Sequence, residues 1–184
     1  MRKLIFFGIL LIMTACQSGD TNVRSPYFSI PEFFRAECSS LKKQKAVLIK
    51  KVQYDGKEEL MQINQPDWEN ELRPFLDCDL NKPAYAGAYT IDTAMTDGAY
   101  AVFYKAKEPK MPIRMVSLNY ANDKLVSVYM ETGKSNSWFR LRQEMTFTPG
   151  EGYQIKGSQK MAIGKETKFT ISGSVLSTSI NSQP

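Results

Sequence analysis

The C-terminal half of the chain alternates between apolar and polar residues with a period of two, and no helical segment interrupts the alternation. From Tyr85 to Val175 this pattern predicts seven consecutive strands, separated by turns such as those at residues 96–98 and 148–152. Strands that follow one another without intervening helices cannot form parallel βαβ units. They are expected to pair as an antiparallel meander with one dry face, and that face needs a cover.

The N-terminal third supplies two amphipathic helices for that cover. The first apolar stripe is Phe33, Phe34, Cys38 and Leu41, and the second is Trp68, Leu72, Phe75 and Leu76. Pro74 is expected to kink or end the second helix. Between the helices, residues 45–54 and 57–64 predict a strand pair joined at Asp55-Gly56. The predicted fold is α+β: two N-terminal amphipathic helices packed on a curved antiparallel β-meander of about seven or more strands, as a half-barrel or incomplete barrel.

The composition narrows the chemistry. At 184 residues, with 42% apolar and 23% charged residues, the chain predicts one globular domain. It contains no histidine, which removes the commonest general base and the commonest transition-metal ligand together. We expect no catalytic residue, no metal site and no cofactor, and therefore no enzyme. The formal charge of +5 permits acidic partners without requiring them, and no nucleic-acid partner is expected.

The N-terminus is typical of a processing signal. Arg2 and Lys3 precede ten uncharged apolar residues at 4–13, too few for a helix that crosses a bilayer. Residues 13–16 (MTAC) follow, and they resemble the lipobox of bacterial lipoproteins, with Met13 where leucine is usual. That resemblance implies lipid attachment at Cys16 and membrane association through it. The alternative is an ordinary secretory signal with a chance cysteine.

These features divide the chain into four parts. Residues 1–15 are predicted to be a signal peptide that is removed, and residues 16–28 a lipidated flexible tether. One α+β domain is expected over 29–176, followed by a flexible tail at 177–184. Gln17 rather than aspartate follows the cysteine. In the enterobacterial sorting scheme this favours the outer membrane, so we expect a lipid-anchored protein of the bacterial cell envelope that faces the periplasm.

Two cysteines remain for the domain, Cys38 and Cys78. Each falls near the end of a predicted helix, and the two helices are expected to pack together. The compartment beyond the inner membrane is oxidising, so a disulfide between them can persist there. Two buried thiols in one core are the alternative.

Several other patterns have ordinary structural interpretations. Residues 39–42 match the catalytic S-x-x-K motif of penicillin-binding enzymes, but the companion motifs are missing. Residues 77–81 resemble the start of an EF-hand calcium loop, but Lys82 and Ala88 stand where that loop needs a glycine and a glutamate. A basic cluster is expected to be a solvated face rather than a lipid contact: Lys42, Lys43, Lys45, Lys50 and Lys51. Five tyrosines are expected to pack in the core or at its rim, with a hydrophobic groove as the alternative: Tyr85, Tyr89, Tyr100, Tyr104 and Tyr120.

One stretch resembles a known group of proteins. Trp68, Glu71, Leu72 and Phe75, continuing into residues 79–83 (DLNKP), resemble a segment of uncharacterised cell-envelope lipoproteins of Bacteroidota, and residues 152–159 agree with it. The resemblance implies an envelope location and no settled activity. The architecture is loosely similar to the half-barrels of Lol-type lipoprotein carriers, and such an analogy does not establish function.

Together these observations predict a non-enzymatic, membrane-anchored periplasmic lipoprotein. It would bind an envelope protein or a hydrophobic lipid ligand through the concave face or an edge of its sheet. One alternative is a structural accessory subunit of an outer-membrane complex. The other is a cell-wall hydrolase that uses paired carboxylates, for which Asp67, Glu71, Asp77 and Asp79 are candidates. That alternative requires two carboxyl groups about 5–10 Å apart in a cleft.

Overall fold

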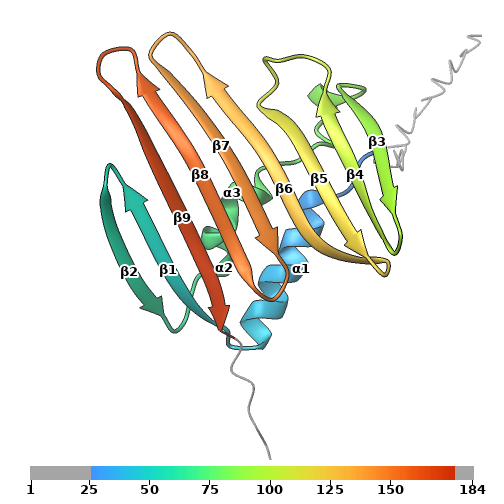
Figure 1. The fold of residues 1–184 in the computed structure, drawn as a ribbon, viewed down its shortest axis with the longest axis horizontal. Coiled ribbons are helices and arrows are strands. Elements are labelled where there is room, and N and C mark those ends of the chain that lie inside the picture. Colours follow the sequence, from blue (N-terminus) through green and yellow to red (C-terminus); the bar gives the residue numbers. More distant parts are fainter. Residues whose placement is uncertain (1–25, 177–184) are drawn as a thin grey trace, which may run out of the picture.

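The computed structural model describes residues 26–176, which form an α+β fold with one open antiparallel sheet (Figure 1). The predicted signal peptide, the lipidation site Cys16 and the predicted tail lie outside the described residues. The nine strands are β1 (Val47–Tyr54), β2 (Lys57–Ile63), β3 (Tyr89–Thr96), β4 (Ala99–Ala106), β5 (Ile113–Ala121), β6 (Lys124–Ser135), β7 (Phe139–Thr148), β8 (Gly152–Met161) and β9 (Glu166–Leu176).

The sheet combines a long meander with the N-terminal strand pair. Its order is β2-β1-β9-β8-β7-β6-β5-β4-β3, and every neighbouring pair is antiparallel. The seven strands from β3 to β9 follow one another as the period-two pattern predicts. β1, near the N-terminal end of the described residues, pairs with β9 at their C-terminal end, and Val52 lies opposite Ile171. Because β2 and β3 do not pair with each other, the sheet is not closed.

Three short helices supply the cover on one face of this sheet. α1 spans Ile30–Lys43, α2 spans Trp68–Glu71, and α3 spans Arg73–Leu76. The single second helix expected from the sequence is thus two four-residue helices, since Pro74 stands at the start of α3 and cannot continue α2. A one-turn 3-10 helix, η1 (Pro83–Tyr85), leads into β3.

The core is built on a cluster of three phenylalanines, in which Phe34 and Phe75 stack and Phe147 packs edge-on against both. The ring centroids of Phe34 in α1 and Phe75 in α3 are 5.0 Å apart, and the Phe147 ring in β7 is 4.9 Å from Phe34. All three side chains are fully buried. Aromatic pairs at such distances add about 0.5–1.5 kcal/mol each beyond the area they bury. This cluster fixes the helices over the middle of the sheet.

The fold begins earlier than the sequence predicts. Tyr27 and Phe28 belong to the expected tether, but Tyr27 is buried and its ring lies edge-on to those of Tyr89 and Tyr104. The backbone N–H of Tyr27 donates to Asn81 Oδ1 at 3.2 Å. The partners of Tyr27 lie 54 or more residues away in the chain, so the local sequence does not indicate that it belongs to the core.

Candidate functional site

The two edges of the sheet differ in how they are protected. β2 begins Lys57-Glu58-Glu59, and charged side chains of this kind discourage pairing with another chain. β3 has a single charged residue, Asp92, no proline, and no register irregularity against β4. After Tyr89 all of its residues are exposed. An edge strand that is regular, exposed and almost uncharged is a template for a further strand.

The backbone groups available on that edge can be assigned from the hydrogen-bond pattern. Lys107 N–H donates to the carbonyl of Ala88 at 2.9 Å, whereas Tyr89 N–H donates to the Tyr27 hydroxyl at 3.3 Å. Bonding to the neighbouring strand alternates from residue to residue in an antiparallel pair. The N–H and C=O groups of the odd-numbered residues therefore point away from β4. Tyr89 N–H is already occupied, which leaves those of Ile91, Thr93 and Met95.

Two of these residues also present apolar side chains. Ile91 and Met95 are 51% and 79% exposed and lie opposite Tyr104 and Tyr100, on the face of the sheet that carries the core. Tyr100 stacks on Tyr120 with the ring centroids 4.6 Å apart. The candidate site is this β3 edge, with outward backbone groups and an apolar strip of alternate side chains beside them. The helices do not cover it.

The five tyrosines of the sequence analysis come from this end of the sheet but do not enclose a space. Tyr89 and Tyr104 are buried against Tyr27, and Tyr85 lies 6.3 Å from Tyr89. Burial raises the pKa of Tyr104 and, more strongly, that of Tyr89, so both hydroxyls stay protonated. They pack in the core, as expected.

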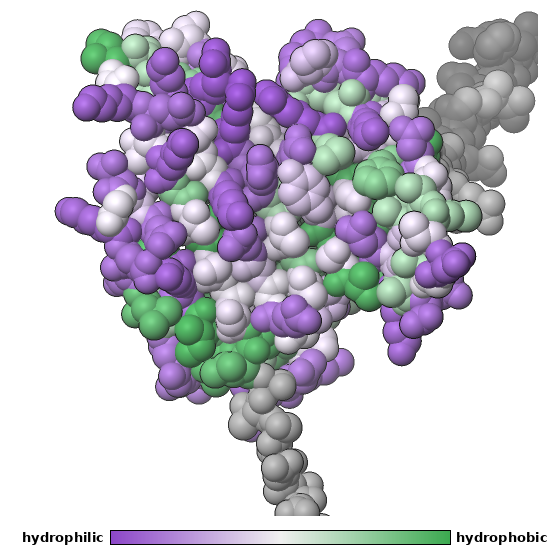
Figure 2. All heavy atoms as spheres, viewed as in Figure 1, coloured by the Kyte–Doolittle hydropathy of each residue, from purple (hydrophilic) through white to green (hydrophobic). Residues whose placement is uncertain are grey.

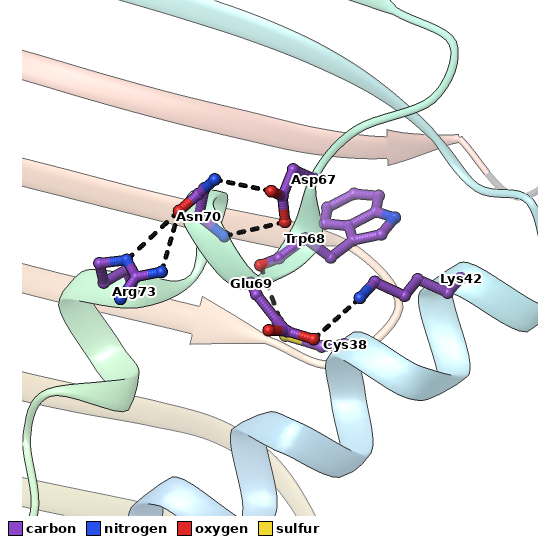
Figure 3. Close-up of polar contacts among 7 residues, drawn as sticks. All are labelled: Cys38, Lys42, Asp67, Trp68, Glu69, Asn70 and Arg73. Carbon is purple, nitrogen blue, oxygen red and sulfur yellow. Dashed lines mark hydrogen bonds and ion pairs between the residues drawn. The ribbon is translucent and has the colours of Figure 1, made fainter.

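Three lysines of the basic cluster form ion pairs, one of them with a candidate catalytic carboxylate, Glu71. Lys42 Nζ is 2.9 Å from Glu69 Oε1, on the exposed side of α2 (Figure 3). Lys50 Nζ donates to both carboxylate oxygens of Glu71, at 3.0 and 2.8 Å. The Tyr153 hydroxyl donates to Glu71 Oε2 at 2.7 Å, which joins α2 to β1 and β8. Glu71 thus has a structural role.

Two more of the candidate catalytic carboxylates, Asp67 and Asp79, accept hydrogen bonds from nearby residues of the chain. Asp67 is the N-cap of α2 and accepts from the backbone N–H of Asn70 at 3.3 Å and from its side-chain amide at 2.6 Å (Figure 3). Asp79 accepts from the backbone N–H of Asn81 at 2.9 Å. Asp77 is exposed. The four carboxylates named from the sequence therefore form no common site.

The two cysteines are free, buried thiols rather than the disulfide that the sequence suggested. Cys38 Sγ donates to the carbonyl of Trp68 at 3.4 Å, and Cys78 Sγ donates to that of Pro74 at 3.3 Å. Burial raises the pKa of Cys78 to about 12 and raises that of Cys38. Each thiol satisfies a different carbonyl within the core. Cys16, the lipidation candidate, lies outside the described residues.

A charged groove on the opposite face of the sheet was missed by sequence reasoning. It has a volume of about 500 Å³ over β5–β9, and its lining includes Glu131, Glu144, Arg142, Lys156 and Lys168. Glu131 lies directly opposite Glu144, and the Tyr129 hydroxyl donates to Glu131 Oε1 at 3.0 Å. Burial first, and this hydrogen bond second, raise the pKa of Tyr129 to about 12. The pairing depends on strand register, which alternation alone does not supply.

Within residues 26–176, no group of three or more histidine, cysteine, aspartate or glutamate side chains is placed to hold a metal ion. No helix in that part of the chain has the length and apolar character needed to cross a bilayer. No protein-family model, curated protein or solved structure matches this sequence. The β3 edge is therefore the feature of the described residues that bears most directly on function.

The thiol assignment can be tested by labelling. In a Cys16→Ala variant only Cys38 and Cys78 remain. We expect neither to react with a maleimide at pH 7 while the protein is folded, because a thiol with a pKa of about 12 holds roughly one thiolate in a hundred thousand. After denaturation without reductant, both should react. A denatured, unreduced protein with no reactive thiol would show the disulfide instead.

The Lys50–Glu71–Tyr153 contact predicts unequal effects for two neighbouring substitutions in α2. Glu71→Gln removes a carboxylate that is mostly buried, with 14% of its side chain exposed, and should lower the free energy of unfolding by about 2 kcal/mol. Glu69→Gln breaks an exposed, solvent-screened pair with Lys42 and should cost much less than Glu71→Gln. Urea denaturation of both variants measures the difference. Equal losses would contradict the structural role given to Glu71.

Proposed function

We propose that this protein is a non-enzymatic, lipid-anchored component of the bacterial cell envelope that binds a partner protein by strand addition at β3. The observation that carries the proposal is the β3 edge itself. Ile91, Thr93 and Met95 direct backbone donors and acceptors outward, and the strand has one charged residue, Asp92, and neither a proline nor a bulge to protect that row. An extended segment of another protein can satisfy these groups and add a tenth strand, which is the mode of β-augmentation.

The apolar side chains of the edge favour a protein strand over an isolated lipid. Ile91 and Met95 lie four residues apart on the same face, so a partner strand with apolar residues at alternate positions would pack against both. Specificity in strand addition comes from such side chains, whereas affinity comes from the main-chain hydrogen bonds. A stable complex of this kind also fits the accessory-subunit interpretation.

A ligand held inside the fold has less support. The interior between the helices and the sheet is occupied by the rings of Phe34, Phe75 and Phe147. The hollows found over the described residues, including the 500 Å³ groove, open to solvent and lie on the surface. In this proposal the sheet curves around its helices as an incomplete barrel whose core is filled with side chains.

The location rests on the N-terminal sequence. Residues 13–16 (MTAC) support acylation of Cys16, and Gln17 supports retention at the outer membrane, facing the periplasm. A protein held by two or three acyl chains remains attached to its membrane, since each buried methylene contributes about 0.8 kcal/mol. The anchor would keep the β3 edge at a high local concentration relative to other membrane proteins.

Substitution of Thr93 tests strand addition directly. Thr93→Pro removes an outward N–H but no hydrogen bond to β4, so the fold should persist while the added strand loses a donor. With a photo-reactive residue at position 95, we expect one cross-linked partner in native membranes. Its yield should fall about ten-fold or more in Thr93→Pro.

Two controls make this experiment specific. Thr93→Val keeps the N–H and the β-branched shape, and it should retain the cross-link. A photo-reactive residue at Leu60, which is 67% exposed on the charged β2 edge, should not capture the same protein. An adduct that survives Thr93→Pro undiminished, with the fold intact, would exclude pairing at β3.

The anchor is tested separately by metabolic labelling. Cells that express the full chain are grown with a radioactive fatty acid. We expect the parent protein to be labelled and to sediment with membranes, because its acyl chains are attached through Cys16. Cys16→Ala should abolish the label, and Cys38→Ala should leave it unchanged. Equal labelling of the parent and Cys16→Ala, or no label in either, would contradict the lipoprotein assignment.

The groove on the opposite face supplies one observation in favour of a second function. Glu131 and Glu144 are opposite each other on β6 and β7, and such pairs have Cα atoms about 4.5–5.5 Å apart. Retaining glycosidases use two carboxyl groups about 5 Å apart, and two glutamates that extend side by side from such Cα positions can reach that separation. If this pair hydrolyses wall glycan, the purified protein should release soluble fragments, and Glu144→Gln should reduce the rate at least about a hundred-fold. The exposed Glu151→Gln is the control, and no release from the parent protein eliminates this function.

A further inference from the structure

Two adjacent hairpins end in large apolar side chains that face solvent. The β6–β7 hairpin presents Trp138, which is 73% exposed, and the β8–β9 hairpin presents Met161 and Ile163, which are 48% and 91% exposed. The backbone N–H of Ala162 donates to the carbonyl of Trp138 at 2.7 Å, so the two hairpin ends are joined. Figure 2 shows a hydrophobic cluster at the end of the β8–β9 hairpin, next to hydrophilic residues. We call these joined ends the apolar tip.

The backbone at the exposed tryptophan is fixed by hydrogen bonds within its turn. Asn136 Oδ1 accepts from the backbone N–H groups of Trp138 and Phe139, at 2.8 and 2.9 Å. Phe139 in turn lies opposite Met161 across β7 and β8. Exposing an indole to water does not stabilise the free protein. A turn that is already ordered does lower the entropy cost of binding a partner. The apolar tip is therefore a preorganised contact surface.

The charges next to the apolar tip are mainly positive. Arg140 and Lys160 face each other one rung behind Phe139 and Met161, and Lys165 lies in the β8–β9 turn. Lys134 adds a fourth cation on β6, and Glu166 is the acidic residue of the same rung. None of the four cations forms an ion pair with another residue in the described part of the chain. Their charge is free to interact with an anionic partner.

We propose that the apolar tip inserts into the interface of an anionic lipid bilayer. Tryptophan is enriched at the headgroup level of membranes, where the ring is apolar and the indole N–H remains hydrated. Lysine and arginine side chains one rung behind such a ring can extend to the phosphate level while their methylene stems stay in contact with the acyl region. Basic residues near an anionic surface each strengthen binding. Binding to a protein would not require an apolar tip with basic side chains directly behind it.

This contact is independent of strand addition at β3 and of the lipid at Cys16. The β6–β7 and β8–β9 turns lie at one end of the central strands, whereas β3 is a lateral edge of the sheet (Figure 1). A second attachment at the apolar tip would orient an anchored protein relative to the membrane. It would leave the β3 edge open to a partner beside it.

The chain contains its own probe for the test, since it has two tryptophans and only Trp138 is exposed. Trp68 is 1% exposed and serves as an internal reference. The full-length protein is reconstituted into vesicles that contain brominated lipids, with or without 30% phosphatidylglycerol. We expect the emission of Trp138 to shift to the blue and to be quenched in the anionic vesicles. A Trp138→Ala variant, in which only Trp68 remains, should show no quenching.

A matched pair of charge reversals tests the basic component. Lys165→Glu lies at the apolar tip, and Lys124→Glu lies at the start of β6, next to the β5–β6 turn at the other end of the strands. Both variants replace a lysine by a glutamate, so they have the same net charge. Lys165→Glu should lower the quenched fraction about five-fold, and Lys124→Glu should leave it unchanged. The quenching reports contact by the apolar tip even when the N-terminus holds the protein on the vesicle, so failure here leaves the anchor assignment standing.

Three results would overturn the proposal. Trp138 that is unquenched in anionic vesicles would show that the apolar tip stays in water. Equal quenching with neutral and anionic lipid, unaffected by Lys165→Glu, would show that the basic residues do not contribute. A blue shift that appears only when membrane proteins are added would identify the apolar tip as a protein interface.

Discussion

The packing of the Phe34, Phe75 and Phe147 rings against one another is the interaction on which the rest of this structure depends. It fixes α1 and the short α3 against β7, at the centre of a nine-stranded sheet. Three helices, of which two have four residues each, are too few to cover the whole of one face. One face of the sheet is therefore buried from solvent where the phenylalanine cluster packs the helices against it. It is exposed at β3 and at the hairpin ends.

Those two exposed regions differ in chemistry. β3 offers backbone groups and two apolar side chains, Ile91 and Met95, with Asp92 as the one charged residue of the strand. The apolar tip offers Trp138 and Ile163 in front of a basic rung. The first arrangement suits pairing with a strand of another protein. The second suits a membrane interface, where apolar acyl chains lie next to anionic headgroups. An envelope protein that contacts both a membrane and a partner can use the two regions at once.

Much of the fold could be predicted because its signals are local. Alternation in the segment from Tyr85 to Val175 marks strands, and the break in α2 follows from the ring of Pro74. Other features depend on which strands become neighbours. The pairing of β1 with β9, the facing of Glu131 and Glu144, and the choice of β3 as an edge require long-range register that a period of two does not encode. Helical spacing likewise places the sulfurs of Cys38 and Cys78 in the core without orienting them toward each other, so it does not decide between a disulfide and two thiols.

The central claim is that β3 gains a strand in the envelope, and amide hydrogen exchange measures this residue by residue. The N–H groups of Ile91, Thr93 and Met95 face away from β4, so they should exchange rapidly in the purified protein. In native membranes the same three amides should slow by about a hundred-fold or more, while those of β2 keep their rates. Unchanged exchange at these three positions, or protection that appears on β2 instead, would contradict strand addition at β3.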